Sequence, residues 1–333
     1  MKNLIRDAVG GTPLVQLSNI TKGLNRSIYL KLEYMNPWMS IKDRVALNII
    51  ETAEREGKIH KDTHIIEATS GNTGISLAGI CAARGYAITI VMPEFVSYER
   101  KLLLRMLGAN IVLTPAEQGL LGPVAKSFEL AKEFPLAFIA DQTRNPANPE
   151  AHFATGQEIF EQLNGEVDVF VAASGTGGHI TGVGTYLKSV KPDIQIVAVE
   201  PRQAAVLSGQ VELGAADGNH GVIGIGPGFI PETLNREIID DVIVIDPQCA
   251  YDATKRVIAQ EGLLIGVSTG AAIHAALEIV YPAEKHINIV VIAASSTERY
   301  LSTHLADDAR QYIETLVASP ASSEGIEKLL NKA

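Results

Sequence analysis

Short apolar runs alternate along this chain with longer stretches in which apolar residues recur at helical spacing. The runs are typical of buried strands, and the stretches between them are typical of amphipathic helices. Strands are expected at residues 28–33, 64–68, 87–92, 110–113, 137–140, 167–173, 195–200, 242–245, 264–266 and 287–294. Helices are expected after Lys42, up to about Arg84, and at 98–107, 124–133, 151–164, 180–190, 247–260 and 271–280, with a polar helix from Arg299.

This alternation predicts parallel sheets. Strands that alternate with helices of about ten to fifteen residues form βαβ units, so the predicted fold class is α/β, with two three-layer αβα lobes. The segment Asn145–Pro149 is rich in Asn and Pro, and we place a crossing between the lobes there. Residues 214–232 are rich in Gly and Pro and predict a long functional loop. Ligands bind such folds beyond the carboxyl ends of the strands.

The composition is that of an acidic globular protein. Of 333 residues, 46% are hydrophobic and 20% are charged, and the net charge is −10. This balance excludes a disordered chain, and the negative charge argues against non-specific binding to nucleic acid or to an anionic membrane. The N-terminal segment lacks the apolar core of a secretory signal, and no apolar run is long enough to span a membrane. We therefore expect a cytoplasmic protein.

Cysteine and histidine usage predicts no metal site. Cys81 and Cys249 are far apart in apolar helical patterns, without the spacing of zinc ligands, and the histidines are scattered. We expect two buried free thiols, which is consistent with a reducing compartment.

The segment 36–44 contains the first candidate for chemistry. Pro37 biases the residue before it towards an extended conformation, and a helical pattern begins after Lys42. The first turn of a helix is locally positive, so it favours the neutral amine of a lysine, which is the form that attacks a carbonyl carbon to make a Schiff base. The alternative is a solvated lysine beside Asp43 and Arg44 in a charged first turn.

A glycine-rich loop follows the apolar run at 167–173. The residues Ser174-Gly-Thr-Gly-Gly-His179 follow a strand and open a helix, where inward-facing N–H groups and the helix N-terminus can cradle a phosphate. Their spacing is neither the dinucleotide-binding fingerprint nor a P-loop. The alternative is a purely structural glycine turn.

Three further loops suit small ligands. Thr69-Ser-Gly-Asn-Thr-Gly74 offers hydroxyl, amide and N–H groups without a charge, which suits a bound carboxylate. A cluster of helix N-caps would have the same composition, and both interpretations can hold together. Ser268 is expected at a strand end, before a helix that opens with small residues. Its hydroxyl group could approach a planar ring closely; the alternative is that the small residues serve tight helix packing. Gly224-Ile-Gly-Pro-Gly228 permits a mobile or tightly folded segment.

Taken in order, these motifs resemble one known family. Asn-Pro-x-x-Ser-x-Lys-Asp-Arg at 36–44, Thr-Ser-Gly-Asn-Thr-Gly at 69–74, Gly-Thr-Gly-Gly at 175–178 and Gly-x-Ser-x-Gly-Ala-Ala at 266–272 look like the fold-type II pyridoxal-phosphate enzymes. Within that family the chain is most similar to the branch of cysteine synthases (O-acetylserine sulfhydrylases) and cystathionine β-synthases. The resemblance runs from about Gly10 to Thr303, and the ordered set is far more specific than any single motif.

The resemblance implies roles for individual residues. Lys42 would hold pyridoxal 5′-phosphate as a Schiff base and later act as the base at the substrate Cα. The cofactor would also contact Asn72 at its 3′ oxygen, Ser268 at its ring nitrogen and a phosphate cradle made of Gly175, Thr176, Gly177, Gly178 and His179. The substrate carboxylate would bind Thr69, Ser70, Thr73 and Gln142, and the substrate entrance would be lined by Gly224 and Gly226.

The implied reaction is a β-replacement. O-acetylserine would lose acetate to give an α-aminoacrylate, and sulfide would attack this intermediate to give L-cysteine. The alternatives are a related synthase with another donor or nucleophile (cystathionine β-synthase, or a cyanoalanine- or diaminopropionate-type synthase), a β-eliminating lyase, and an idle homologue whose cleft accepts the C-terminal peptide of a partner protein.

The family also implies a homodimer and a division of the chain. Residues 46–149 would form a smaller, mobile lobe that carries the carboxylate-binding loop. Residues 1–45 and 150–310 would form the larger, cofactor-binding lobe, and residues 311–333 a polar helical tail. The lobes would close on the substrate and keep water out.

Several positions depart from the family pattern. Trp38 and Met39 replace small residues, so they either reshape the approach of the nucleophile or point into the interface between the lobes. His179 stands where cysteine synthases usually have threonine, and Ala68 stands where proline is frequent. These departures concern the identity of the substrates rather than that of the cofactor.

Overall fold

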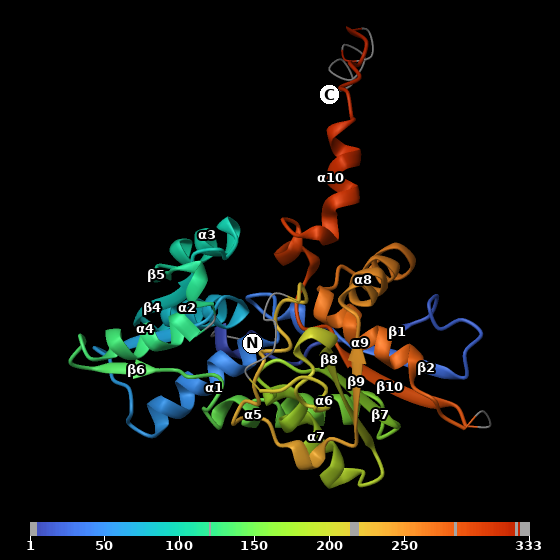
Figure 1. Ribbon diagram of the computed structural model, residues 1–333, viewed down its shortest axis with the longest axis horizontal. Helices are drawn as coiled ribbons and strands as arrows, with labels where there is room; N and C mark the ends of the chain where they lie inside the picture. Colours follow the sequence, from blue (N-terminus) through green and yellow to red (C-terminus); the bar gives the residue numbers. More distant parts are fainter. Residues whose placement is uncertain (1–4, 120, 214–219, 283–284, 324–325, 327–333) are drawn as a thin grey trace. The chain divides into compact units, whose positions relative to one another are not determined.

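Two parallel-rich sheets organise the fold (Figure 1). The computed structural model describes residues 5–119, 121–213, 220–282, 285–323 and 326. The chain divides into two compact units, Met1–Arg299 and Tyr300–Ala333, and both sheets belong to the first unit. The predicted α/β class is therefore confirmed.

The larger sheet has six strands. In spatial order they are β1 (Leu14–Leu17), β2 (Arg26–Lys31), β10 (Ile287–Ile292), β7 (Val169–Ala173), β8 (Gln195–Pro201) and β9 (Asp241–Ile245). Every neighbouring pair is parallel except β1 with β2. Two pairs of helices accompany this sheet in Figure 1: α6 (Phe153–Gln162) with α7 (Gly178–Val190), and α8 (Pro247–Glu261) with α9 (Val267–Glu278).

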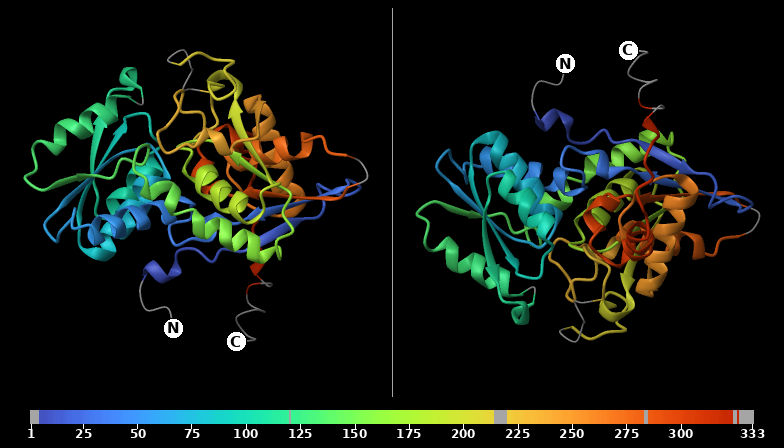
Figure 2. Two further views of the ribbon diagram at one scale, coloured as in Figure 1. Left: turned by 90° about the horizontal axis from the view of Figure 1, so that it is seen from below. Right: turned by 90° about the horizontal axis from the view of Figure 1, so that it is seen from above.

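The smaller sheet has four strands, all parallel. Their spatial order is β5 (Asn110–Thr114), β4 (Ala87–Pro93), β3 (His64–Ala68) and β6 (Ala137–Ile139). The helices associated with this sheet are α1 (Lys42–Arg55), α2 (Asn72–Arg84), α3 (Tyr98–Met106) and α4 (Leu121–Ala131). Figure 2 shows both sheets and their helices from two further directions.

Strands of both sheets are buried, which explains their continuous apolar runs. Phe170 in β7 and Ile196 in β8 have no exposed surface, and neither do Ile65 in β3 and Ile90 in β4. Among the described residues, many buried apolar side chains pack into a cluster at the smaller sheet and into another at the larger sheet. Full burial of one such side chain stabilises the fold by roughly 1.5–3 kcal/mol. The cores thus hold the strand ends, and the loops that follow them, in place.

The strand order creates a switch point in each sheet. In the smaller sheet the chain runs from β3 to β4 and β5 on one side and then returns to β6 on the other side of β3. In the larger sheet, β8 and β10 flank β7 in the same way. Loops that leave neighbouring strands at a switch point diverge and open a crevice for ligands. The loops that begin at Thr69 and Ser174 follow β3 and β7, so both predicted ligand loops lie at switch points.

Several details differ from the prediction. Strand β1 is missing from it, because a four-residue edge strand leaves too short a pattern to recognise. Residues 264–266 form no strand, and Ile265 instead makes a single bridge to Ser296. Helix α9 begins at Val267 rather than at 271, so Ser268 lies inside its first turn. Cys81 is buried as expected, but Cys249 is only partly buried.

Short helices complete the first unit. Helix α5 (Ala147–Glu150) forms inside the Asn- and Pro-rich segment and contacts both α1 and α7. The 3₁₀ turns are η1 (Ile5–Ala8), η2 (Glu33–Met35), η3 (Ala116–Gln118), η4 (Arg202–Ala204), η5 (Arg236–Ile238) and, extending to the second unit, η6 (Thr297–Tyr300).

The described part of the second unit contains η7 (His304–Ala306) and α10 (Asp307–Glu314). Asp307 and Asp308 lie in the first turn of α10, where the helix dipole favours negative charge. Within the predicted loop at 214–232, residues 214–219 lie outside the described residues. Within the predicted tail at 311–333, residues 324–325 and 327–333 also lie outside the described residues.

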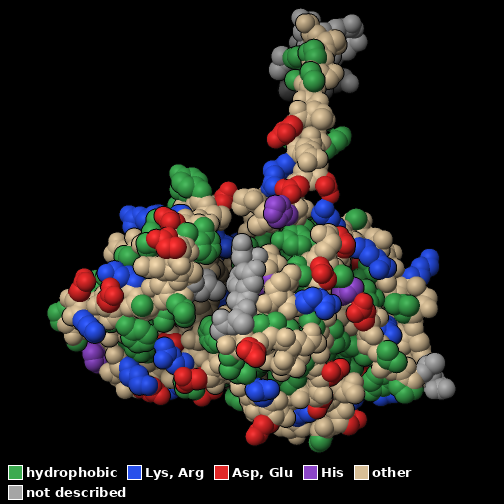
Figure 3. Space-filling view, viewed as in Figure 1, with side chains coloured by type: hydrophobic (Ala, Val, Ile, Leu, Met, Phe, Trp, Pro, Cys, Tyr) green, Lys and Arg blue, Asp and Glu red, His purple; other side chains and the backbone are tan. Residues whose placement is uncertain are grey.

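On the face shown in Figure 3, basic and acidic side chains are intermixed. Across the described ranges, no helix is both long enough and apolar enough to cross a membrane.

Candidate active site

Lys42 is the first residue of α1. The N–H group of Ile41 donates to the carbonyl oxygen of Ala294 at 2.9 Å, and Ser40 forms a bridge with Ser295. The start of α1 is thus tied to the segment that follows β10, beside a switch point. The surrounding protein displaces water from the ammonium group and lowers the pKa of Lys42 to about 8. At pH 7 about a tenth of Lys42 is therefore the neutral, nucleophilic amine, far more than for a lysine of ordinary pKa.

Asp43, the next residue, is fully buried and joins α1 to α2. Its carboxyl group accepts hydrogen bonds from the N–H group of Trp38 at 2.6 Å and from the hydroxyl group of Ser76 at 2.5 Å. Burial raises the pKa of Asp43 to about 7. Asp43 and Arg44, which the alternative interpretation placed in a solvated first turn, are both buried.

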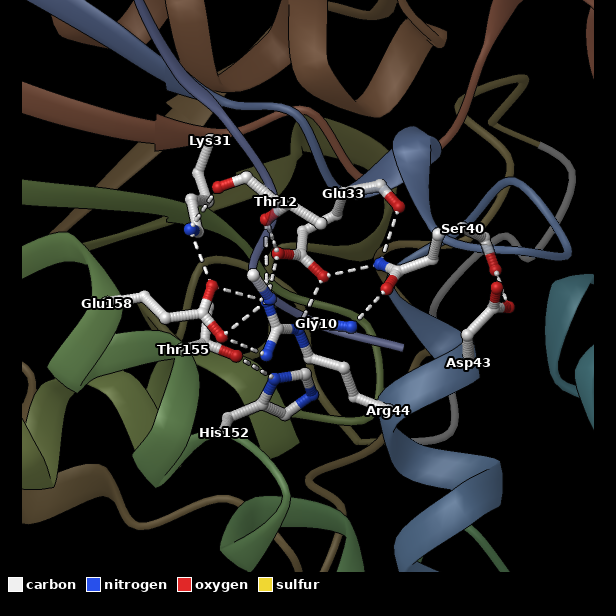
Figure 4. A network of polar contacts seen from close by, with 12 residues as sticks. Gly10, Thr12, Lys31, Glu33, Ser40, Asp43, Arg44, His152, Thr155 and Glu158 are labelled. Atoms are coloured by element: carbon white, nitrogen blue, oxygen red, sulfur yellow. Dashed lines mark hydrogen bonds and ion pairs between the residues drawn. The ribbon is translucent and has the colours of Figure 1, made fainter. Parts of the chain in front are cut away.

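A buried ion network holds the other side of this turn (Figure 4). Arg44 Nε lies 2.7 Å from Glu33 Oε2, and Arg44 Nη1 lies 2.7 Å from Glu158 Oε1. Glu158 Oε2 also lies 2.6 Å from Lys31 Nζ. Burial favours the neutral acid, but the hydrogen bonds and charges of Arg44 and Lys31 outweigh it and lower the pKa of Glu158 to about 2. Removing one partner of a buried pair costs about 3–5 kcal/mol, so this network anchors the start of α1 firmly.

The loop after β7 is a tight cradle of backbone groups. Gly177 is the N-cap of α7 and has a φ of +79°, which glycine adopts without strain. A Cβ atom at Gly175 would lie 2.2 Å from the carbonyl oxygen of Gly224, and one at Gly178 would lie 1.9 Å from Asn148 Oδ1. The glycines are therefore structural, and they also leave the N–H groups at the start of α7 open to an anion.

Asn148 connects this cradle to Gln142 in the loop after β6. Its side-chain amide group donates to the carbonyl oxygen of Gln142 at 2.7 Å and to the hydroxyl group of Thr176 at 3.0 Å. The hydroxyl group of Thr233 donates to the carbonyl oxygen of Thr176 at 2.5 Å. Sequence reasoning missed both Asn148 and Thr233. The Asn- and Pro-rich segment marked the position of Asn148, but not its contacts.

The loop after β3 meets the loop after β6. The hydroxyl group of Thr73 donates to the side-chain oxygen of Gln142 at 2.6 Å, across 69 positions of sequence. The hydroxyl group of Thr69 accepts from the N–H group of Gly71 at 3.2 Å, but the N-cap of α2 is Gly71 and no side chain caps this helix, so the predicted cluster of side-chain N-caps is not found here. Asn72 Oδ1 is buried without a hydrogen-bond partner among the described residues. Together with the partly buried Ser70, this arrangement offers neutral polar groups to a ligand.

His179, in the first turn of α7, lies near a second histidine. The ring centroids of His179 and His152 are 6.2 Å apart, and the rings meet edge-on at 77°. Desolvation, with a contribution from the charge of Lys42, lowers the pKa of His179 to about 3. Desolvation also lowers the pKa of His152 well below its usual value. Both imidazole rings are therefore neutral at physiological pH, and His152 is another site residue that the sequence analysis missed.

Ser268 is buried in the first turn of α9. The N–H group of Gly266, the N-cap of α9, donates to the carbonyl oxygen of Ser295 at 2.9 Å. Ser295 is also the bridge partner of Ser40. The segment after β10 therefore positions both Ser268 and Lys42.

The predicted entrance segment packs on the glycine cradle. The carbonyl oxygen of Gly224 occupies the space next to Gly175, and the N–H group of Gly226 donates to the carbonyl oxygen of Ser174 at 2.9 Å. Both Gly224 and Gly226 have positive φ angles, of +96° and +58°. The segment is therefore tightly folded at these positions.

Trp38 packs into the core of the smaller sheet. Its Nε1 atom would lie 2.0 Å from a Cβ atom at Gly79, in the middle of α2. The indole ring therefore lies against α2 in the core of the smaller sheet. Met39 differs, because its side chain is 38% exposed and its φ is +61°.

Residues 5–295 match the family described as "Pyridoxal-phosphate dependent enzyme". The chain belongs to this family. It is 46% identical over 303 residues to the cysteine synthase of Staphylococcus aureus, a match that covers 90% of this chain and 96% of the relative. The resemblance read from the sequence motifs is therefore confirmed.

Solved structures give the same result. The cysteine synthase of Entamoeba histolytica matches with a TM-score of 0.87 and 39% identity, covering 99% of this chain and 96% of that chain. An O-ureido-L-serine synthase matches with a TM-score of 0.86 and 36% identity, covering 98% of this chain and 99% of that chain. The fold is accordingly that of the fold-type II pyridoxal-phosphate enzymes.

The cofactor of this pyridoxal-phosphate enzyme fits the residues present. The glycine loop at 175–178 leads into the N-terminus of α7, where the N–H groups and the helix dipole suit a phosphate group. The unpartnered amide oxygen of Asn72 marks a polar group that the protein alone does not satisfy. Lys42 supplies an amine whose lowered pKa suits a Schiff base with an aldehyde.

Proposed function

We propose that this enzyme makes L-cysteine from O-acetylserine and sulfide by β-replacement. The observation that carries the proposal is the placement of Lys42 at the start of α1, where desolvation lowers its pKa to about 8. The similarity to a cysteine synthase at 46% identity supports this choice of reaction.

The proposed cofactor site combines four elements. When bound, pyridoxal phosphate supplies an electron sink for the negative charge that develops at the substrate Cα. The residues that would hold it are Lys42, Asn72, Gly175, Thr176, Gly177, Gly178, His179 and Ser268. The phosphate would lie on the N–H groups at the start of α7, where the helix dipole is favourable.

Lys42 has two proposed tasks. It would bind the cofactor covalently, and after release it would take the proton from the substrate Cα as acetate leaves. A base with a pKa of about 8 can both accept and return a proton near neutral pH. Ser268 would face the ring nitrogen with an uncharged hydroxyl group, which favours elimination and replacement over transamination.

The substrate carboxylate would bind the loop after β3. Thr69, Ser70 and Thr73 would supply neutral hydrogen-bond donors, and Gln142 would approach from the loop after β6. Neutral donors at a switch point suit a carboxylate without a competing charge. Gly224 and Gly226 would line the entrance, because their segment lies against the cradle.

A second candidate is a related synthase with another donor or nucleophile. The structural similarity to an O-ureido-L-serine synthase supports it, as does His179, which replaces the threonine usual in cysteine synthases. A β-eliminating lyase differs from both because it releases pyruvate without any nucleophile.

We also propose that the protein is a cytoplasmic homodimer. Each subunit would have a smaller lobe of residues 46–149 and a larger lobe of residues 1–45 and 150–310, and the two lobes would close on the substrate. The unpaired Cys81 and Cys249 support a reducing compartment. The separate apolar clusters support two lobes. The neutral loop after β3 would also accept the C-terminal carboxylate of a partner peptide, which would compete with O-acetylserine.

The visible absorption spectrum of the purified enzyme tests the reaction. A Schiff-base band that changes on addition of O-acetylserine and returns on addition of sulfide, with L-cysteine formed, is the expected result. A cofactor band that ignores O-acetylserine but responds to another activated serine would favour the second candidate. Pyruvate release with O-acetylserine alone would favour the lyase.

A further inference from the structure

A buried carboxyl group lies behind the loop proposed to bind the substrate carboxylate. Glu67 belongs to β3, two positions before Thr69, and is only 2% exposed. Its Oε2 atom is buried without a hydrogen-bond partner among the described residues. A charged carboxylate with an unsatisfied buried oxygen is far more costly than the neutral acid.

The contacts of Glu67 lead directly to Gln142. The backbone N–H groups of Asp141 and Gln142 and the side-chain amide of Gln142 all hydrogen-bond to Glu67. The side-chain oxygen of Gln142 accepts from the hydroxyl group of Thr73 at 2.6 Å. The amide group of Gln142 is therefore held from both sides, and one of its two N–H bonds remains for a ligand.

The backbone is bent to make these contacts. Asp141 has a φ of +47°, a conformation that costs a non-glycine residue energy and that the surroundings must enforce. This turn ends the pairing of β6 with β3 and directs two consecutive N–H groups to one carboxyl group.

The charges around Glu67 do not favour its ionised form. Asp141 adds a negative charge, although Arg144 Nε lies 3.0 Å from Asp141 Oδ2 and partly offsets it. The neighbouring strands β4 and β6 and the first two turns of α2 contain no titratable residue. On α4, which packs on β3, Lys126 pairs with Glu129 at 2.9 Å, and Arg100 on α3 donates to the carbonyl oxygen of Ser70 at 3.3 Å. Burial therefore dominates and raises the pKa of Glu67 to about 8.

We infer that Glu67 is a positioning residue for the substrate carboxylate: as the neutral acid it holds Gln142 ready to bind an anion, and on ionising it weakens that binding. Because Glu67 acts through a substrate-carboxylate site, its role rests on the proposed function. Substrate affinity then falls as the pH rises through the ionisation of Glu67, since a second negative charge lies behind the bound carboxylate.

The affinity of the holoenzyme for two small probes tests this role. Propionate carries a carboxylate and no amine, and propionamide has the same shape without the charge. In the wild-type enzyme the dissociation constant of propionate, measured by calorimetry from about pH 6 to about pH 10, should rise several-fold to about tenfold above about pH 8. The dissociation constant of propionamide should stay constant, because a neutral ligand does not feel the new charge.

The variant Glu67→Gln separates Glu67 from other titrating groups. The glutamine keeps the size and polarity of the side chain but cannot ionise, so propionate affinity should match that of the wild type near pH 7 and stay constant above pH 8. Asp168→Asn, a carboxyl-to-amide change just before β7, is the matched control and should keep the alkaline loss of the wild type. If Lys42 rather than Glu67 causes the loss, Glu67→Gln will retain it.

Each outcome decides between distinct conclusions. Constant propionate affinity in the wild type, or an undiminished alkaline loss in Glu67→Gln, overturns the role of Glu67. Parallel weakening of both probes also overturns it, because that result indicates a loosened loop rather than charge repulsion. If the wild-type enzyme binds propionate at no pH, the carboxylate-binding loop of the proposed function is itself wrong. Should Glu67→Gln fail to fold, the comparison of the two probes in the wild type still decides.

Discussion

The hydroxyl group of Ser76 lies 2.5 Å from Oδ1 of Asp43 and joins the helix that carries the carboxylate loop to the helix that begins with Lys42. Both partners are fully buried. This contact fixes two loops of the candidate site relative to one another, so its loss should affect both stability and catalysis.

Ser76→Ala should destabilise the protein in a pH-dependent manner. Burial raises the pKa of Asp43 from 3.8 to about 7, so the cost of burying this carboxyl group grows as the pH rises from about 3.8 to about 7, and the group is ionised in the folded protein only above about pH 7. The serine hydroxyl stabilises the ionised form, and its removal should cost about 1.5–3 kcal/mol above pH 7 and less at pH 5. Urea unfolding at both pH values measures this difference. Ser127→Ala, which removes a buried hydroxyl group from the neutral carbonyl oxygen of Val124, should show no such pH dependence.

Lys42→Ala should abolish covalent attachment of the cofactor and lower kcat by at least about a thousandfold. After borohydride reduction, mass spectrometry should find the cofactor on the wild-type chain and not on the variant. Lys101→Ala, which removes a lysine from α3, should behave as the wild type in both assays. Turnover of Lys42→Ala at the wild-type rate would contradict the role given to Lys42.

Ser268→Asp should lower the rate of β-replacement about tenfold or more. A carboxylate beside the ring nitrogen favours its protonation, and the buried position offers little water to stabilise the added charge. The expected signs are a smaller kcat and a changed visible spectrum of the bound cofactor. Unchanged β-replacement in Ser268→Asp would remove Ser268 from the cofactor site.

Gly177→Ala should lose cofactor affinity by at least about tenfold, a free-energy change of about 1.4 kcal/mol. The Cβ atom would lie 2.5 Å from Leu234 Cβ, at the N-terminus that would bind the phosphate. Gly85→Ala is a matched control, because Gly85 has the same φ of +79° and no atom within 4 Å of a Cβ. Both variants should lose about 1–2 kcal/mol of stability through backbone strain. Equal cofactor affinity in the two variants would contradict the phosphate site.

His179→Gln should resist mild acid better than the wild type. Desolvation lowers the pKa of His179 to about 3, below its usual value of 6.5, so the unfolded chain binds the extra proton first. His179 therefore stabilises the fold fully above pH 6.5, and this contribution is lost as the pH falls towards 3. Between pH 7 and pH 5 the free energy of unfolding of the wild type should fall by about 1–2 kcal/mol more than that of the variant. Parallel stability curves from pH 7 to pH 5 would contradict a neutral His179.

The local pattern of residues determined most of the strands and the loops that open the helices. The periodicity of apolar residues predicted the strands at 64–68, 87–92 and 195–200 almost to the residue, because buried parallel strands need continuous apolar runs. The glycine and hydroxyl loops were recognisable because a helix N-terminus after a strand demands those residue types. The edge strand β1 and the start of α9 escaped prediction, since short elements and small-residue helices carry little periodicity.

Only the tertiary structure decided the electrostatics and the contacts between loops. Residues far apart in sequence meet at the switch points, as Thr73 and Gln142 do, and no local pattern encodes such a pairing. The lowered pKa of Lys42 and the raised pKa of Glu67 come from burial by distant segments. The sequence alone thus determined which chemical groups this protein carries. Folding decided their protonation and their neighbours, because both depend on how much water the packed chain excludes.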